Sequence, residues 1–442
     1  MKLSSNRRAF LVPCLLALTA CASPQSPETK AASPASEPAP PKPVAAITIP
    51  RAPPPPPPGD VYVDAAWVQE RLARGAVVAL DARPGARYAE GHLAGAVRLE
   101  GVTEVEGLRR ELAGAGLCQG PVVLYGEAGS GPALARMFAL LEAAGLADVY
   151  VLRGGVAAWR EQGLPLVKQT PASRSCEWKA PGHEVLVSRD AMMDAFGQRG
   201  IEVLDLRDHG WEGNYDAPAH FRAGHIPFAL PFDLTRFGDV AADAVRLDDV
   251  RTAVTQLGPR KNDTVPITST FILHGDGPED PRPLEGYLLM RAAGLKARIY
   301  SEGWQGWTPA PVVRVVEAEE VARLMEPGPG ATPEAHPMLL DLREPWDFRL
   351  AYLPGSQSLA LRLMLKGDTF ESFVQQHWPQ ADRAKTPLIF VCYGHSCVRS
   401  REAAVFAARK GFTHLLWYRE GVDGWRAKGL PLLNLPRDGA TP

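Results

Sequence analysis

The sequence lacks any excess of charge of one sign. Lysine and arginine number 48, aspartate and glutamate number 50, and the formal net charge is −2. No basic stripe runs along the chain, which argues against a polyanionic partner such as nucleic acid. After the N-terminus, no apolar stretch approaches the roughly 20 residues that span a bilayer.

Residue patterns for metal ions and nucleotides are also missing. The six cysteines and ten histidines form no cluster with the spacing of zinc ligands, and the chain has no glycine-rich phosphate loop. We therefore expect neither a metal site nor a bound cofactor. The composition, with 45% hydrophobic and 22% charged residues, is that of a soluble globular protein, and 442 residues suffice for about three domains.

The N-terminus has the layout of a secretory signal, with a basic start, a short apolar core over 9–18 and small residues after it. The segment Leu18-Thr19-Ala20-Cys21 resembles the lipobox of bacterial lipoproteins. In such proteins the cysteine thiol is acylated and becomes the mature N-terminus. We expect residues 1–20 to be a signal peptide and Cys21 to be lipidated, with an ordinary signal peptide as the alternative.

The residues that follow extend this interpretation. Acyl chains on Cys21 would hold the protein at a membrane without a transmembrane helix. Ala22 and Ser23 resemble the outer-membrane sorting pattern, so the expected location is the cell envelope, at the outer membrane facing the periplasm. Residues 24–58 include 14 prolines, which favour an extended chain over a packed core. We assign 21–58 to the lipidated cysteine and a proline-rich tether.

From residue 59 onward, four marks recur three times in the same order. The first is a short apolar strand ending in Asp-x-Arg, at Asp81 and Arg83, Asp205 and Arg207, and Asp341 and Arg343. The second is a tight turn, at 91–96, 224–227 and 352–356. The third is a strand, loop and amphipathic helix, at 122–141, 271–292 and 388–408. The fourth is a glycine with a tryptophan four residues later, at Gly155 and Trp159, Gly303 and Trp307, and Gly421 and Trp425.

The repeating unit is more than a hundred residues long, so the copies are separate domains and not stacked repeats. Apolar strands that alternate with helical segments predict an α/β fold, with a mainly parallel sheet covered by helices on both faces. The order of the four marks resembles the rhodanese family. This resemblance implies three tandem rhodanese-like domains, at 59–168, 183–311 and 312–434.

In that family a nucleophilic cysteine directly follows a strand, and its loop leads into a helix. The loop amides and the positive end of the helix lower the thiol pKa and favour the thiolate. The thiolate takes a sulfane sulfur from a small anionic donor such as thiosulfate and carries it as a persulfide to cyanide or a thiol. Gly126 and Gly275 stand at this position in the first two copies. We expect those copies to have a structural or binding role.

The third copy has Cys392 at the position of the nucleophile, so the resemblance implies a sulfurtransferase whose anion cradle is the loop 393–399. Arg399 is expected to supply charge at the helix entrance. It follows the cysteine by seven residues instead of the family's five, which leaves the substrate open. The remaining substrate-binding candidates are Tyr393, Gly394, His395, Ser396, Val398, Asp341 and Arg343. Asp341 and Arg343 have a structural alternative, in which the pair ties the strand end to a neighbouring loop.

Cys397 lies inside the same loop and leaves several interpretations open. Cys392 and Cys397 could form a disulfide in an oxidising periplasm. That disulfide would be a resolving step for the persulfide, a thiol–disulfide redox site or a structural link. The alternatives to a sulfurtransferase are therefore a redox protein and a non-catalytic, lipid-tethered binding scaffold. A second disulfide, between Cys118 and Cys176, is possible but not decided by the sequence.

Overall fold

The computed structural model describes residues 61–99, 101–169, 175–195, 198, 200–207, 221, 223–240, 246–257, 265–307, 311–326, 336–366, 368–394, 397 and 399–435. The expected signal peptide, Cys21 and the tether lie outside these residues, as do His395, Ser396 and Val398. Within the described ranges, no helix is long and apolar enough to cross a membrane. We refer to 61–169 as the first unit, 175–307 as the middle unit and 311–435 as the third unit.

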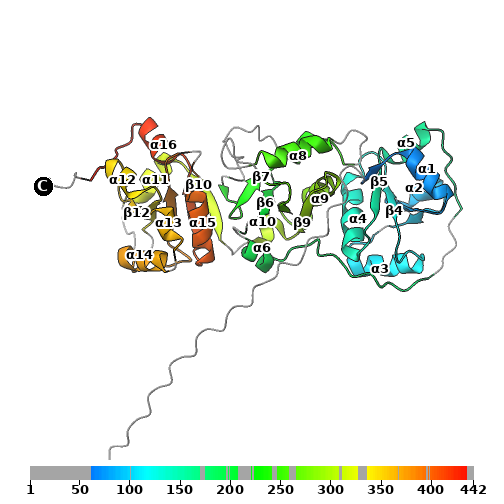
Figure 1. Cartoon of the computed structure of the whole chain (residues 1–442), viewed down its shortest axis with the longest axis horizontal. Coiled ribbons are helices and arrows are strands. Elements are labelled where there is room, and N and C mark those ends of the chain that lie inside the picture. The colour runs from blue at the N-terminus through cyan, green and yellow to red at the C-terminus, as the bar shows by residue number, and fades with distance from the viewer. Residues whose placement is uncertain are drawn as a thin grey trace, which may run out of the picture. The chain divides into compact units, whose positions relative to one another are not determined.

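The first unit is a five-stranded parallel sheet with helices on its faces (Figure 1). Its strands, in spatial order, are β1 (Tyr62–Val63), β5 (Val149–Leu152), β4 (Val122–Tyr125), β2 (Val78–Asp81) and β3 (Val97–Arg98). Its helices are α1 (Ala65–Ala73), α2 (Gly85–Glu90), α3 (Val105–Gly114), α4 (Gly131–Ala144) and α5 (Gly155–Glu161).

The third unit repeats this order of strands. From edge to edge they are β10 (Val312–Val316), β14 (His414–Tyr418), β13 (Leu388–Val391), β11 (Met338–Asp341) and β12 (Gln357–Ser358), all parallel. Its helices are α11 (Ala318–Met325), α12 (Pro345–Leu350), α13 (Leu361–Met364), α14 (Thr369–His377), α15 (Arg399–Arg409) and α16 (Gly421–Ala427).

The middle unit has a four-stranded parallel sheet (Figure 1), in the order β7 (Ala229–Pro231), β6 (Ile201–Asp205), β8 (Thr270–His274) and β9 (Lys296–Tyr300). An isolated parallel bridge from Leu186 to Ile299 stands where the other sheets have their first strand. Its helices are α6 (Arg189–Ala195), the 3₁₀ turn η1 (Leu234–Phe237), α8 (Leu247–Thr255), α9 (Arg282–Ala292) and α10 (Gly303–Trp307). Three parallel sheets with flanking helices confirm the expected fold class.

The short apolar strands lie in the middle of their sheets, so both of their faces are buried. In β13, Leu388 and Phe390 belong to one hydrophobic cluster, and the alternate residues Ile389 and Val391 belong to another. Successive side chains of a strand point to opposite faces, so the two clusters are the cores on the two sides of the sheet. This explains why the sequence shows continuous apolar runs here and no alternation with polar residues.

A disulfide and a helix–helix contact join the first unit to the middle unit. Cys118, after α3, forms a disulfide with Cys176 at the start of the middle unit, with their Cα atoms 6.0 Å apart. Helix α4 packs against α9, where the buried Glu142 carboxylate accepts hydrogen bonds from Tyr287 and Arg291 at 2.7 and 2.8 Å. The buried carboxylate is tolerated because it is paired with a charge and hydrogen-bonded.

Candidate active site

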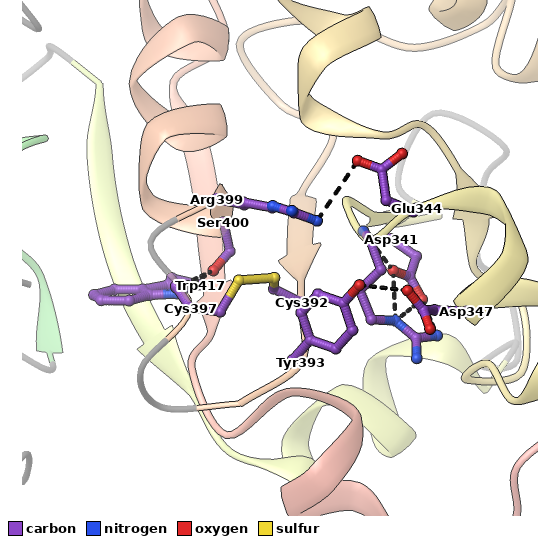
Figure 2. The surroundings of a disulfide bond; sticks show 10 residues. Asp341, Glu344, Asp347, Cys392, Tyr393, Cys397, Arg399, Ser400 and Trp417 are labelled. Carbon is purple, nitrogen blue, oxygen red and sulfur yellow. Dashed lines mark hydrogen bonds and ion pairs between the residues drawn. A yellow bond between two sulfur atoms is a disulfide. The ribbon is translucent and has the colours of Figure 1, made fainter. Parts of the chain in front are cut away.

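Cys392 directly follows β13 and is 1% exposed. It forms a disulfide with Cys397, with the Cα atoms 6.2 Å apart, so the two loop cysteines are joined in this structure (Figure 2). The disulfide that the sequence left open is therefore present. The loop between the two cysteines is further closed by a backbone hydrogen bond, in which the amide of Cys397 donates to the carbonyl of Gly394 at 2.9 Å.

The loop is backed by the start of α16. The amides of Val422 and Asp423 donate to the carbonyls of Cys392 and Tyr393 at 3.0 and 2.9 Å. Gly421, with φ of +64°, brings this helix so close that a Cβ atom there would lie 2.5 Å from the Cys392 carbonyl oxygen. Only glycine combines this conformation with this approach.

The other two units have the same close contact between a helix-opening glycine and the loop after the central strand. A Cβ atom at Gly155 would lie 2.3 Å from the Gly126 carbonyl oxygen, and one at Gly303 would lie 2.7 Å from that of Gly275. The tryptophan of each pair donates its indole N–H to a proline carbonyl, at Pro165, Pro311 and Pro431. The fourth sequence mark is therefore a support for the loop after the central strand.

The entrance of α15 carries the candidate cation. Arg399 is the first residue of the helix, and its guanidinium lies 5.6 Å from the centre of the Tyr393 ring. Its Nη1 is 3.9 Å from a carboxylate oxygen of Glu344 and has no hydrogen-bond partner within the described residues. The side chain is 34% exposed. A positive charge beside a helix N-terminus is suited to stabilising an anion or a thiolate.

Tyr393 anchors the other side of the loop. Its hydroxyl donates to the carboxylate of Asp347 on α12 (Figure 2). Burial and this hydrogen bond raise the pKa of Tyr393, so the phenol keeps its proton at neutral pH. Gly394 follows, and a Cβ atom there would meet Asp423 at 3.3 Å, so the loop runs close to α16.

Asp341 and Arg343 form a buried ion pair. The Arg343 guanidinium donates to the Asp341 carboxylate at 2.7 Å and also to the carbonyl of Ala351. The first and middle units contain the same arrangement, with Gly91 and Gly224 as the carbonyl partners. These bonds support the structural interpretation, in which the arginine ties the strand end to the neighbouring turn.

Several residues around the loop were not expected from the sequence. The hydroxyl of Ser400 accepts a 2.9 Å hydrogen bond from the indole of Trp417 on β14, which holds the first turn of α15 against the sheet. Glu344 and Asp347 are the anionic partners of Arg399 and Tyr393. The one signal for them in the sequence was their position after the Asp-x-Arg strand.

In the first and middle units, side chains fill the space above the thiol-free position. A Cβ atom at Gly126 would lie 2.1 Å from the Ser130 hydroxyl, and one at Gly275 would lie 1.9 Å from the Asp280 carboxylate. Asp280 accepts hydrogen bonds from the amides of Asp276 and Arg282 and from the Arg282 guanidinium. These bonds to Arg282 outweigh burial and lower the pKa of Asp280.

A buried cysteine after a central parallel strand, at the entrance of a helix with a leading arginine, defines a thiol-centred α/β site. Two regions of the chain, 64–162 and 317–428, match the family model of the rhodanese-like domain. These two regions are therefore similar to the rhodanese-like domain, and the second region includes Cys392. The middle unit lies between the two matched regions.

Several proteins similar to this chain have names that describe sulfur transfer. A thiosulfate sulfurtransferase of Azotobacter vinelandii is 27% identical over 266 residues, which are 56% of this chain and 94% of the relative. A probable 3-mercaptopyruvate sulfurtransferase of Pseudomonas aeruginosa is 36% identical over 110 residues, which are 24% of this chain and 38% of the relative. The structure of a 3-mercaptopyruvate sulfotransferase from Escherichia coli is 18% identical, covers 55% of this chain and 98% of its own, and has a TM-score of 0.41.

Proposed function

We propose that this protein is a sulfurtransferase that carries sulfane sulfur as a persulfide on Cys392 of the third unit. The observation that supports it most is the place of Cys392, buried at the end of β13 beside the entrance of α15, inside a region that matches the rhodanese-like domain. The names of the relatives point to the same chemistry. We also propose that the middle unit is a third rhodanese-like domain, because it shares the four marks and the Gly303 support.

The proposed first step is a displacement at sulfur. The Cys392 thiolate attacks the outer sulfur of thiosulfate, the S–S bond of the donor breaks, and sulfite leaves with the bonding electron pair. The loop 393–399 cradles the anion, and Arg399 offsets the charge that gathers near the thiolate. In the second step cyanide or a thiolate attacks the outer sulfur of the persulfide, and the Cys392 thiolate is released.

The disulfide gives Cys397 a role in this scheme. If its thiolate attacks the inner sulfur of the persulfide, hydrosulfide leaves and the Cys392–Cys397 disulfide forms. A further turnover then needs a dithiol or another two-electron reductant to cleave the disulfide. On this proposal the disulfide in the structure is the oxidised resting form, and the chain becomes active after reduction.

Single cysteine variants test this division of roles. Cys392→Ser should abolish thiosulfate:cyanide sulfur transfer under reducing conditions, because no other described thiol lies at the end of a central strand. Cys397→Ser should leave the first step intact and remove the need for reductant. Mass spectrometry of the reduced chain after thiosulfate should show one added sulfur on Cys392. Equal and complete loss of activity in both variants would overturn the proposal.

The disulfide also favours a second candidate function, a thiol–disulfide redox protein that uses Cys392 and Cys397. Such a protein would exchange electrons with a dithiol substrate and gain no sulfur from thiosulfate. The added sulfur on Cys392 therefore separates the two functions. A chain that neither gains sulfur nor exchanges its disulfide would instead support the third candidate, a tethered binding scaffold.

A further inference from the structure

The active-site helix of the third unit presents one stripe of side chains to the middle unit. Arg401, Val405 and Arg409 are spaced four residues apart on α15 and so lie on one face of the helix. Val405 is 3% exposed and belongs to the hydrophobic core of the middle unit, together with Val203 and Ile272. The remaining buried residues of α15, such as Ala404 and Ala407, pack in the core of the third unit.

Charge complements this apolar contact at both ends of the stripe. Arg401 is paired electrostatically with Glu202 on β6, and Arg409 with Asp194 on α6. Both carboxylates come from the middle unit, so the two cations of the stripe face acidic partners across the contact. The helix that leads out of the Cys392 loop is therefore held between two units and not by the third unit alone.

Arg401 meets a strained residue of the middle unit. Its guanidinium donates to the carbonyl of Phe228 at 2.6 Å and lies 5.0 Å from the centre of the Phe228 ring. Phe228 has φ of +70° and is the one non-glycine residue with positive φ in the described part of the chain. The corresponding turns of the other units have glycine, at Gly95 with φ of +71° and Gly355 with φ of +79°.

A side chain in this conformation costs free energy, so its contacts need to compensate for it. A glycine at position 228 would have no ring for the Arg401 guanidinium to contact. The backbone carbonyl and the ring together hold a guanidinium that lies two residues after Arg399, in the first turn of α15. The same turn is held from the third unit by the hydrogen bond of Trp417 to Ser400.

We propose that the middle unit braces the active-site helix, and that Arg401, held on Phe228, is a positioning residue for the loop that carries Cys392. The inference rests on the proposed function of Cys392. The middle unit, which has no thiol at the end of its central strand, then has a role in catalysis: it fixes the helix entrance against which the thiolate and the incoming anion are placed. Arg401 acts through α15 and does not itself touch the donor.

The experiment uses the full chain with Cys397→Ser, so that Cys392 is free in the loop. The rate of alkylation of Cys392 by iodoacetamide is followed across pH by mass spectrometry of its peptide, which reports the thiol pKa. Arg401→Met should slow alkylation at neutral pH about fivefold, as a shift of the helix end weakens its stabilisation of the thiolate, and should raise KM for thiosulfate more than it lowers kcat. Arg110→Met, a change of the same kind at an exposed position on α3, is the matched control and should change neither.

Phe228→Gly keeps the test decisive if Arg401→Met folds poorly. This variant introduces the residue that stands in the corresponding turns of the other two units, and it removes the strain of positive φ. The chain should therefore fold, and alkylation of Cys392 should still slow. Because both side chains act through one contact, the double variant should be no slower than the slower single variant. Unchanged alkylation in a folded Arg401→Met chain, or additive effects in the double variant, would overturn the proposal. A wild-type chain without sulfur transfer would refute the proposed function instead, since the alkylation profiles remain measurable.

Discussion

At the scale of single residues, the proposed sulfur chemistry depends on the residue that follows the central strand. It is Gly126, Gly275 and Cys392 in the three units, as the sequence showed. The sequence did not show that the side chains of Ser130 and Asp280 occupy the space next to these glycines, because those contacts cross a loop whose path no pattern predicts. In both thiol-free units, another side chain therefore lies where a Cβ atom at the glycine would be.

We predict that a cysteine alone will not restore chemistry to the middle unit. In a Cys392→Ser chain, Gly275→Cys should take up no sulfur from thiosulfate and should lower the free energy of unfolding by about 1–3 kcal/mol, because its Cβ meets Asp280. Adding Asp280→Gly should remove that clash and one of the two carboxylates paired with Arg282, which keeps Asp276 as its partner. Mass spectrometry should then detect one added sulfur on the introduced thiol when both middle-unit changes are present. Sulfur uptake without the change at Asp280 would contradict this account of its side chain.

A buried histidine makes the middle unit sensitive to acid. Burial lowers the pKa of His225 to about 3, while the ring stacks on Phe221 and bonds to its carbonyl. The unfolded chain binds the proton near pH 6.5, so it holds more protons than the folded chain between these values. The stability that the neutral ring contributes is therefore present above pH 6.5 and is lost progressively as the pH falls below it.

The third unit suggests the matching variant, because Tyr352 stacks on Phe348 at the corresponding position. His225→Tyr should remove this part of the pH dependence. Between pH 6.5 and pH 5, the wild type should lose about 1–2 kcal/mol more unfolding free energy than the variant, as measured by urea titration at each pH. If the wild type and the variant lose the same unfolding free energy as the pH falls, the acid sensitivity comes from other groups, such as the buried His274.

At the scale of elements, the central strands and the loop before α15 were predictable, and the contacts between elements were not. Continuous apolar runs identified β13 and its counterparts because both faces of each strand are buried. The pairing of Trp417 with Ser400, by contrast, joins a strand to a helix whose relative placement depends on packing. The same holds for Glu344 and Arg399. Such pairs leave no spacing rule in the sequence.

The loop that carries Cys392 depends directly on Gly421, the first residue of α16. Gly421→Ala should lower the free energy of unfolding by about 3 kcal/mol, because positive φ and a close backbone contact with Cys392 act together. Gly429→Ala is the matched control: it has φ of +70° and no neighbour within 4 Å, so it should cost only about 1 kcal/mol. Sulfur transfer should be lost in the first variant and retained in the second. If both variants lose a similar free energy of unfolding, the close contact between Gly421 and Cys392 does not contribute to the effect.

At the scale of the whole molecule, three parallel sheets were predictable because the four marks recur three times in the same order along the chain. The packing of α4 on α9 was not, since nothing marks Glu142 as a residue with a partner in another unit. The contact between the middle unit and α15 was not predictable either. The lack of a thiol indicated a structural or binding role for the middle unit, but nothing in the sequence marked Val405 as part of its core.

The lipid anchor is a prediction about the whole chain. We propose acylation of Cys21, with the folded units held at the outer membrane by the proline-rich tether. Cys21→Ser should move the protein from the membrane fraction to the soluble fraction of a bacterial host, and a fatty-acid label should mark only the wild type. The variant should retain its sulfur transfer in solution. Membrane association without any label on the wild type would count against the anchor.

Strand β10 has a consequence for the way the chain matures. Its residue Val313 exchanges backbone hydrogen bonds with His225 of the middle unit, while the strand forms the edge of the third sheet beside β14. A chain growing from its N-terminus therefore cannot complete the middle unit when residue 307 emerges. It has to wait for the first strand of the third unit, and that strand has to wait for β14, which is made about a hundred residues later. The last two units thus reach their finished state together, near the end of synthesis.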